Sequence, residues 1–403
     1  MILFVAYGGG HVAALAPVAL ALRAAGQPFV FLALTTAKAY LDRLGLATIG
    51  FADLPDVAQA QVQAHGQRLA AALPAGGVVE PEETVAYLGL NYRDLETEYG
   101  VDGAAEQYRQ HGRQAFLPVP TLVAAIQKYR PQLVVTTNAP RAERAAVLAA
   151  GRCGVPALCV VDLFAVHEMK WVAVPGFGDL VCVLNAAVRD AFVAFGREPE
   201  RVLVTGNPAF DCLHAPEVIA AGDAMRRDRG WNDGVITLLW ASQIESATHP
   251  FTGQAGDPSL PRRIEQYLRA YVARQSGYRL VVRYHPSERE QFVAQPGVAF
   301  SACNEELGAL LHAVDLVVVT ASTVGLEASL AGRAVITVDD SIYRADAPYS
   351  EMGIATGSPT VEDLGRVIGE VAARIKSVDD TATATGASAT AQVLAAIRTL
   401  LPL

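Results

Sequence analysis

Residues 2–13 read ILFVAYGGGHVA, a continuous apolar run followed by three glycines and the start of a helical pattern. An apolar run without polar alternation is typical of a strand that is buried on both faces of a parallel sheet. The glycines allow a tight turn, and they leave backbone N–H groups and a helix N-terminus open toward an anion or a hydroxyl group. The stretch therefore predicts a strand, a loop and a helix, the repeating unit of a doubly wound α/β domain.

Units of the same kind recur along the chain. Strands are expected at 2–7, 28–34, 132–136, 156–161, 180–184 and 201–205, and again at 235–240, 279–284, 298–301, 316–320 and 334–338. Helices are expected at 11–25, 37–44, 139–152, 186–196, 262–275, 305–312, 324–331 and 361–376. This alternation predicts two Rossmann-like domains with doubly wound parallel sheets, one stacked after the other in the sequence.

The pattern also suggests where the domains begin and end. We expect the first domain over 1–205 and the second over 206–380. Residues 52–122 are richer in Glu, Gln, Tyr and Arg and are expected to form inserted helices beside the ligand-binding edge of the first sheet. Residues 381–403 are expected to form a Thr/Ala/Gly/Ser linker, 381–390, and a last helix, 391–401.

Composition narrows the class of protein. The chain has 403 residues, of which 52% are apolar and 18% charged, and no apolar run reaches the roughly 18 to 20 residues of a transmembrane helix. The N-terminus lacks a basic segment and a cleavage site, so we expect no signal peptide. A net charge of −9 argues against nucleic acid as a partner. Five cysteines without a Cys-x-x-Cys pair favour buried thiols, and we expect a cytoplasmic protein.

The glycine loop also fits a loose dinucleotide-binding fingerprint, G-x-G-x-x-A, at Gly8, Gly10 and Ala13. That fingerprint requires an acidic residue about 20 positions on, at the end of the second strand, to hold a ribose. No Asp or Glu occurs between Met1 and Leu41. The sequence therefore argues against a nicotinamide or flavin enzyme.

His11 lies just inside the first expected helix and has two interpretations. In the structural one, its imidazole caps the glycine loop or packs under it. In the functional one, the imidazole hydrogen-bonds a hydroxyl group as a general base or an orienting group, a role worth about 10²- to 10⁴-fold in rate.

Polar residues follow three expected strands of the second half: Ser242 and Gln243 follow 235–240, His285 follows 279–284, and Ser322 follows 316–320. The strand at 316–320 leads into Ser322 and Thr323, where a capping hydroxyl and unpaired N–H groups would form a cradle for a diphosphate. Glu327, one turn further, would accept both hydroxyls of a ribose. The structural alternative is that Ser322 only caps the helix and Glu327 is solvated. His285, after the strand at 279–284, favours the functional interpretation.

Two sets of motifs resemble known families. Gly-Gly-Gly-His at 8–11, followed by Pro17, Ala19 and Leu22, resembles the opening of GT-B glycosyltransferases, including the MurG-like enzymes. The runs VTGNP at 204–208 with Asp211, HP at 285–286, ASTVGLEA at 321–328 and AGRAV at 331–335 are similar to the second half of UDP-N-acetylglucosamine 2-epimerases, which share that fold. The motifs span residues 2–339, and the segment 52–122 is unmatched.

The resemblance implies a GT-B fold, with two domains facing across a cleft and a C-terminal helix returning to the first domain. It implies that a nucleotide-sugar donor binds the second domain, with the pyrophosphate at Ser322 and Thr323, the ribose at Glu327 and the diphosphate or base near His285. The expected donor-binding residues are Gly206, Asn207, Ser242, Gln243, Arg283, His285, Pro286, Thr320, Ser322, Thr323, Gly325 and Glu327.

The acceptor would meet the first domain near the loop of Gly8, Gly9 and Gly10, with His11 as the catalytic candidate. Asp162 and His167, just past a strand end, are alternative bases or ordinary loop residues.

No metal is expected, because GT-B enzymes generally stabilise the leaving diphosphate with helix dipoles and side chains. The sequence has no H-E-x-x-H and no Cys/His cluster. His167 and Glu168 form half of a zinc motif, but Trp171 stands where the second His belongs.

The chain departs from the epimerase pattern at one informative place. That family carries a His-Arg-Arg-Glu-Asn run after the first strand of its second domain, whereas this chain has ASQIE at 241–245. The family's acidic motifs are also not recognisable around 161–164. Epimerisation needs placed acids and bases, so these departures favour sugar transfer.

The leading hypothesis is a metal-independent glycosyltransferase of polysaccharide or glycoconjugate biosynthesis. Its acceptor is a hydroxyl of a glycan, a lipid-linked molecule or a small molecule. UDP is the favoured nucleotide of the donor, with CMP, CDP, GDP and dTDP left open. The alternatives are an epimerase-like enzyme and a non-catalytic GT-B protein that binds a glycan or a partner. Peripheral membrane contact and a homodimer are both compatible with the sequence.

Overall fold

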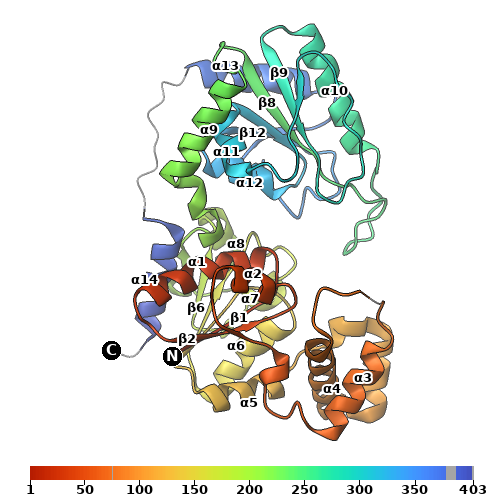
Figure 1. Cartoon of the computed structure of the whole chain (residues 1–403), viewed down its shortest axis with the longest axis vertical. Helices are drawn as coiled ribbons and strands as arrows, with labels where there is room; N and C mark the ends of the chain where they lie inside the picture. Colours follow the sequence, from red (N-terminus) through yellow and green to blue (C-terminus); the bar gives the residue numbers. More distant parts are fainter. Residues whose placement is uncertain (75, 378–386, 402–403) are drawn as a thin grey trace. The chain divides into compact units, whose positions relative to one another are not determined.

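The computed structural model describes residues 1–74, 76–377 and 387–401. They divide into two compact units, Met1–Ala209 with Gly386–Leu403, and Phe210–Thr385. Each unit is built on one parallel sheet that is covered by helices (Figure 1), which confirms the predicted α/β class. None of the helices in the described ranges combines the length and apolarity needed to cross a membrane.

The sheet of the first unit has, within the described residues, seven parallel strands in the order β3-β2-β1-β4-β5-β6-β7. These are β1 (Ile2–Ala6), β2 (Phe29–Ala33), β3 (Thr48–Ile49), β4 (Leu133–Thr136), β5 (Ala157–Val160), β6 (Leu180–Val183) and β7 (Val202–Val204). Strand order reverses between β1 and β4, and open α/β sheets bind ligands at the carboxyl edge of such a switch point.

The helices of the first unit alternate with these strands. They are α1 (Gly10–Ala24), α2 (Ala37–Arg43), α3 (Ala60–Ala70), α4 (Pro81–His111), α5 (Val119–Tyr129), α6 (Ala142–Cys153), α7 (Met169–Val172), α8 (Ala186–Phe195) and α14 (Ala389–Leu400), with short 3₁₀ helices at Phe51–Asp53, Gly112–Ala115 and Pro199–Arg201.

One core lies between this sheet and α1. Phe4 stacks on Phe31 with ring centroids 5.3 Å apart, and both side chains are fully buried. Val393 and Ile397 of α14 are buried in the same core, and α14 lies beside α1 (Figure 1). The predicted return of the C-terminal helix to the first unit is therefore confirmed. Helix α14 begins two residues earlier than expected, and residues 381–386 of the expected linker lie outside the described residues.

Helices α3 and α4, which come between β3 and β4 in the sequence, pack against one another and have a small core of their own. Two glycines allow this close approach. A Cβ on Gly66 would lie 2.1 Å from the carbonyl oxygen of Val85, and one on Gly89 would lie 2.1 Å from that of Val62. The helix–helix contact is therefore made by backbone against backbone.

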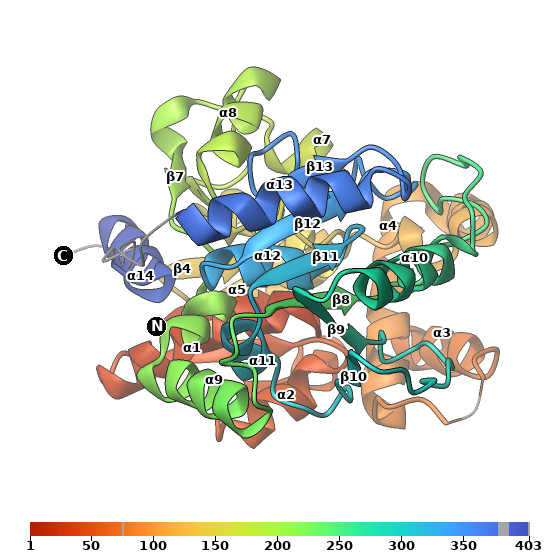
Figure 2. The ribbon, with the colours of Figure 1, turned by 90° about the horizontal axis from the view of Figure 1, so that it is seen from above.

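The second unit contains, among its described residues, six parallel strands in the order β10-β9-β8-β11-β12-β13. They are β8 (Ile236–Ala241), β9 (Tyr278–Arg283), β10 (Val298–Phe300), β11 (Leu316–Val319), β12 (Ala334–Val338) and β13 (Thr356–Ser358). The helices are α9 (Pro216–Asp228), α10 (Leu260–Arg274), α11 (Leu307–Ala313), α12 (Thr323–Leu330) and α13 (Leu364–Ser377), and a 3₁₀ helix, Pro208–His214, follows β7. Figure 2 shows α13 lying along β12, and the two are in contact.

The elements that were not expected from the sequence include β3, β13 and α9. β3 has only two residues, and β13 reads Thr-Gly-Ser, so neither presents an apolar run. Helix α9 buries only Gly222 among its described residues and therefore shows no continuous apolar stripe. Elements at the margin of a core bury little and leave a weak hydrophobic pattern in the sequence.

Candidate functional site

The glycine loop follows β1 at the carboxyl edge of the first sheet. A Cβ on Gly8 would lie 1.8 Å from Oγ1 of Thr36, so no side chain fits there unless a neighbour moves. Gly9, which precedes α1, has φ +70° and ψ −137°, a conformation that other residues rarely adopt. Gly10 and His11 then begin α1. The loop of Gly8, Gly9 and Gly10 thus requires glycine for backbone reasons and places His11 at a strand end.

His11 and Asp162 lie close together although they are far apart in the sequence. Oδ2 of Asp162 is 3.5 Å from Nδ1 of His11, and Oγ1 of Thr137 is 2.8 Å from the same nitrogen. The three residues follow the neighbouring strands β1, β5 and β4. No hydrogen bond from the described residues reaches Nε2 of His11, whose side chain is 25% exposed. That nitrogen is therefore available to a ligand.

Glu143, in the first turn of α6, is a candidate that the sequence analysis missed. Its side chain is fully buried. The carboxylate accepts the N–H of Tyr7 at 2.7 Å, the N–H of Ala139 at 3.1 Å and the hydroxyl of Thr137. Burial raises the pKa of Glu143, while the charge of His11 and these hydrogen bonds oppose the rise. The sequence held no signal for this burial, because an acidic residue in a first helical turn is ordinarily solvated.

The candidate His167 lies in the loop between β5 and α7, beside Glu168. Burial raises the pKa of Glu168, the charge of Asp162 raises it further, and the charges of His167 and His11 lower it. The structure therefore brings His11 and Asp162 together and places His167 in the loop that Asp162 begins.

Gly206 and Asn207 were grouped with the donor site, and the structure assigns both to the first unit. Asn207 is buried, its amide donates to the carbonyl of Asp162 at 2.5 Å, and its side-chain oxygen accepts the N–H of Ala209 at 2.9 Å. Asn138 accepts the N–H of Asp162 at 2.9 Å. These contacts fix the backbone that carries Asp162.

In the second unit, Ser322 and Thr323 lie where β11 meets α12. Ser322 is the N-cap residue, and its hydroxyl accepts the N–H of Val324 at 3.3 Å. The N–H of Thr323 has no acceptor among the described residues, as expected in a first helical turn. The buried hydroxyl of Thr320 likewise has no partner among them, which costs about 1–3 kcal/mol. Unpaired donors thus gather at this strand end.

Glu327, one turn into α12, is partly buried. Burial raises its pKa to about 7, and the charge of Arg283 lowers it. The Arg283 guanidinium donates to Oγ of Ser301 at 2.9 Å and to three backbone carbonyls within residues 302–305 at 3.0 to 3.1 Å. Arg283 therefore holds that loop, and no hydrogen bond from the described residues occupies the carboxylate of Glu327.

Ser242 and His285 are held by one carboxylate, Glu288. The hydroxyl of Ser242 donates to Glu288 at 3.0 Å and accepts from Arg262 at 2.8 Å. Glu288 also accepts the N–H of His285 at 2.7 Å. The ends of the neighbouring strands β8 and β9 are thereby tied together. Of the remaining predicted residues here, Gln243 is half-buried and Pro286 is exposed.

Gly325 is a buried residue of α12. A Cβ there would be 2.8 Å from Cγ2 of Val319 and 3.2 Å from Cε2 of Tyr349. The hydroxyl of Tyr349 donates to the carbonyl of Ser322 at 2.9 Å. The absent side chain of Gly325 therefore lets Tyr349 support the start of α12.

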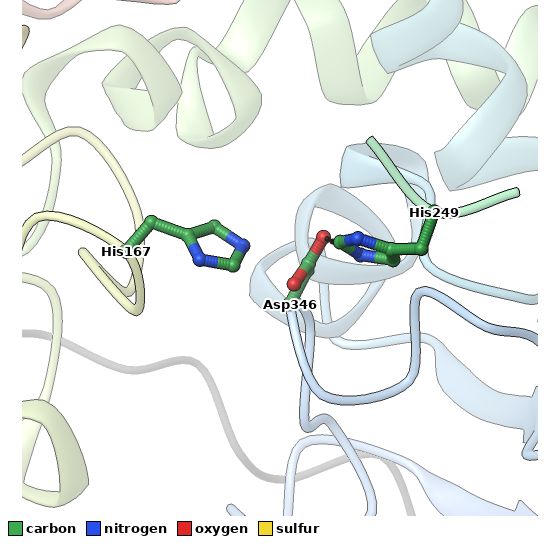
Figure 3. A group of neighbouring side chains, drawn as sticks. All are labelled: His167, His249 and Asp346. Carbon is green, nitrogen blue, oxygen red and sulfur yellow. Dashed lines mark hydrogen bonds and ion pairs between the residues drawn. The ribbon is translucent and has the colours of Figure 1, made fainter. Parts of the chain in front are cut away.

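Buried His249 and partly exposed Asp346 form a pair in two loops of the second unit (Figure 3). Nε2 of His249 lies 3.0 Å from Asp346, and Nδ1 accepts the N–H groups of Phe251 and Thr252 at 3.1 and 3.2 Å. These contacts tie the two loops together. The pair offers fewer ligands than the three protein ligands of a catalytic zinc site. His167, also labelled in Figure 3, belongs to the first unit. That no metal takes part stays a prediction.

No protein-family model matches the chain, and no curated protein matches it in sequence. Solved structures match it over almost its whole length. The UDP-GlcNAc 2-epimerase from Neisseria meningitidis bound to UDP-GlcNAc has a TM-score of 0.59 at 12% identity, covering 99% of this chain and 100% of that chain. MurG from Acinetobacter baumannii has a TM-score of 0.53 at 13% identity, with 99% of each chain covered.

A glycosyltransferase of kitacinnamycin has a TM-score of 0.56 at 15% identity and covers 100% of this chain and 99% of that chain. The chain has the GT-B fold. Epimerases and glycosyltransferases both occur among these GT-B structures, so the likeness confirms the fold that the motifs predicted, and the reaction has to be argued from the site.

Proposed function

We propose that the protein is a glycosyltransferase that moves a sugar from a nucleotide donor to a hydroxyl acceptor without a metal ion. The observation that carries the proposal is the arrangement around His11. Its Nδ1 is held by Thr137 and faces Asp162, while Nε2 is open at the switch point of the first sheet. An imidazole oriented in this way can accept the proton of a bound hydroxyl group.

The donor side of the proposal rests on the second unit. The unpaired N–H of Thr323 and the positive end of α12 favour a diphosphate at this strand end. The carboxylate of Glu327 follows one turn later and can accept two ribose hydroxyls. The N–H groups and the positive end of the helix would stabilise the negative charge on the leaving diphosphate, which a metal ion stabilises in other transferases.

The chemistry then needs one proton transfer and one displacement. Nε2 of His11 takes the proton of the acceptor hydroxyl, and the acceptor oxygen bonds to the anomeric carbon of the donor sugar. The bond from that carbon to the diphosphate oxygen breaks, and the nucleoside diphosphate leaves with the electron pair. Asp162, 3.5 Å from Nδ1, stabilises the imidazolium that forms.

The proposal is tested by following UDP-N-acetylglucosamine by NMR with and without hydroxyl acceptors. We expect the donor to persist alone and to release UDP with an acceptor. His11→Gln should abolish turnover and keep nucleotide binding. Conversion of the donor to the manno sugar without an acceptor would establish the epimerase alternative. Wild-type protein that binds nucleotide and turns over none of a broad acceptor panel would favour a binding protein.

The donor base is tested by thermal shift with UDP, GDP, CMP, CDP and dTDP. A ligand present at about 100 times its Kd stabilises the protein by about 2.7 kcal/mol, which raises the melting temperature measurably. We expect the largest shift with UDP. No shift with any nucleotide would contradict the donor site.

A further inference from the structure

Glu143 is a buried carboxylate that the proposed mechanism does not use. Its side chain has no exposed surface, and burying a carboxylate is costly unless hydrogen bonds compensate it. Three donors do so: the N–H of Tyr7 on one oxygen, and the N–H of Ala139 and the hydroxyl of Thr137 on the other. The hydroxyl of Thr137 is the point where this buried group reaches His11.

The direction of these hydrogen bonds follows from proton counting. The hydroxyl of Thr137 donates to Glu143, and a threonine hydroxyl carries a single proton. The proton of Thr137 therefore points to Glu143, so Oγ1 of Thr137 must accept from Nδ1 of His11, 2.8 Å away. Asp162 favours the same proton position, but at 3.5 Å it makes the longer contact.

We propose that Glu143, acting through Thr137, holds the proton of His11 on Nδ1 and thereby keeps Nε2 as the unprotonated nitrogen. Glu143 is a positioning residue, because it touches His11 only through Thr137. The inference rests on the proposed function for its catalytic meaning, since only a base at Nε2 makes the tautomer matter. The opposite tautomer would place a proton on Nε2, and His11 could not accept one there.

Replacing the carboxylate by an amide reverses the chain of donors. In Glu143→Gln, the side-chain oxygen can keep the N–H of Tyr7, and the amide nitrogen then donates to Thr137 and no longer accepts the N–H of Ala139. Thr137 is left with its proton free to point to Nδ1 of His11, which moves the imidazole proton to Nε2. The two side chains have nearly the same shape, so the change reverses the hydrogen bond to Thr137 and costs the one from Ala139.

The test is the tautomer of His11, read by long-range ¹H–¹⁵N NMR of the full chain labelled at its eight histidines at pH 7.5. His11→Gln identifies the signal of His11. We expect a protonated Nδ1 in the wild type and in Thr137→Ser, and a protonated Nε2 in Glu143→Gln. Thr137→Val should lose the preference. Thr136→Val, which removes the hydroxyl of the preceding residue in β4, is the matched control and should leave the tautomer unchanged.

In the transfer assay, Glu143→Gln should lower kcat by at least about 100-fold while KM for the donor stays the same. A protonated Nε2 in the wild type, or an unchanged tautomer in Glu143→Gln, would overturn the proposal. The tautomer is measured without turnover, so the two proposals fail separately. If the tautomer shifts in Glu143→Gln but the wild type shows no transferase activity, the proposed function is contradicted and the role of Glu143 is supported.

Discussion

Replacing Glu327 with Gln is expected to stabilise the protein at alkaline pH. Burial raises the pKa of Glu327 from its ordinary value of 4.5 to about 7, so the folded state holds this proton more tightly than the unfolded chain does. Stability therefore falls as pH rises from 4.5 through 7, and the whole cost is present above pH 7. The rise corresponds to at most about 3 kcal/mol. Gln carries no charge and escapes this cost.

The assay is urea unfolding of the wild type and Glu327→Gln between pH 4.5 and 8. The two proteins should unfold alike near pH 4.5, and the variant should gain up to about 3 kcal/mol by pH 8. Glu217→Gln, at an exposed position in α9, is the matched control and should show no such trend. A variant that is no more stable than the wild type at pH 8 would show that ionising Glu327 does not destabilise the folded state.

The same variant links stability to the proposed function. If the carboxylate of Glu327 accepts ribose hydroxyls, Glu327→Gln should bind UDP more weakly although it is more stable. A residue that costs stability and contributes to binding is the usual form of a stability–function trade-off. A gain in stability with unchanged UDP affinity would show that the carboxylate of Glu327 does not bind the ribose.

Three further predictions concern side chains and backbone that are buried inside each unit, and the exposure of one cysteine. Gly89→Ala should destabilise the protein by about 1–3 kcal/mol in thermal unfolding, because the methyl group meets the backbone of Val62. The control Gly151→Ala in α6 should not destabilise it, because a Cβ there meets nothing within 4 Å. Mass spectrometry after maleimide labelling of the native protein should find exposed Cys303 modified and Cys159 and Cys182 intact, since both are fully buried and burial raises the pKa of Cys182 to about 12. Arg197→Met should lower the free energy of unfolding by about 3 kcal/mol or more in chemical denaturation, because the buried guanidinium donates to the carbonyls of Val174, Phe177 and Gly178 at 2.8 to 3.0 Å. An unchanged free energy of unfolding would show that these carbonyls find other donors.

The fold was readable from the sequence because its strands are buried on both faces. β1, β4 and β11 are continuous apolar runs, and each was expected to within two residues of its observed ends. The margins of the sheets were not readable, since β3 and β13 bury too little to leave a pattern. The closure of the first core by α14 depends on long-range packing, yet the resemblance to the GT-B fold implied it.

The candidate site was readable only in outline. That His11 and Asp162 lie at one edge of the first sheet could be inferred, because the carboxyl ends of parallel strands meet at one edge. What each side chain binds could not. Arg283 and Ser242 carry the polarity of ligand-binding residues, and the structure shows both engaged by their own unit. Glu143 resembles an ordinary first-turn carboxylate until packing buries it under the glycine loop.

The central claim is that the start of α12 binds the diphosphate of a nucleotide-sugar donor. A crystal structure of the full chain with UDP tests it most directly. We expect the diphosphate to lie against the N–H of Thr323 and the hydroxyl of Ser322, with the ribose hydroxyls on the carboxylate of Glu327. Density for UDP at another place, or none at millimolar UDP, would contradict it.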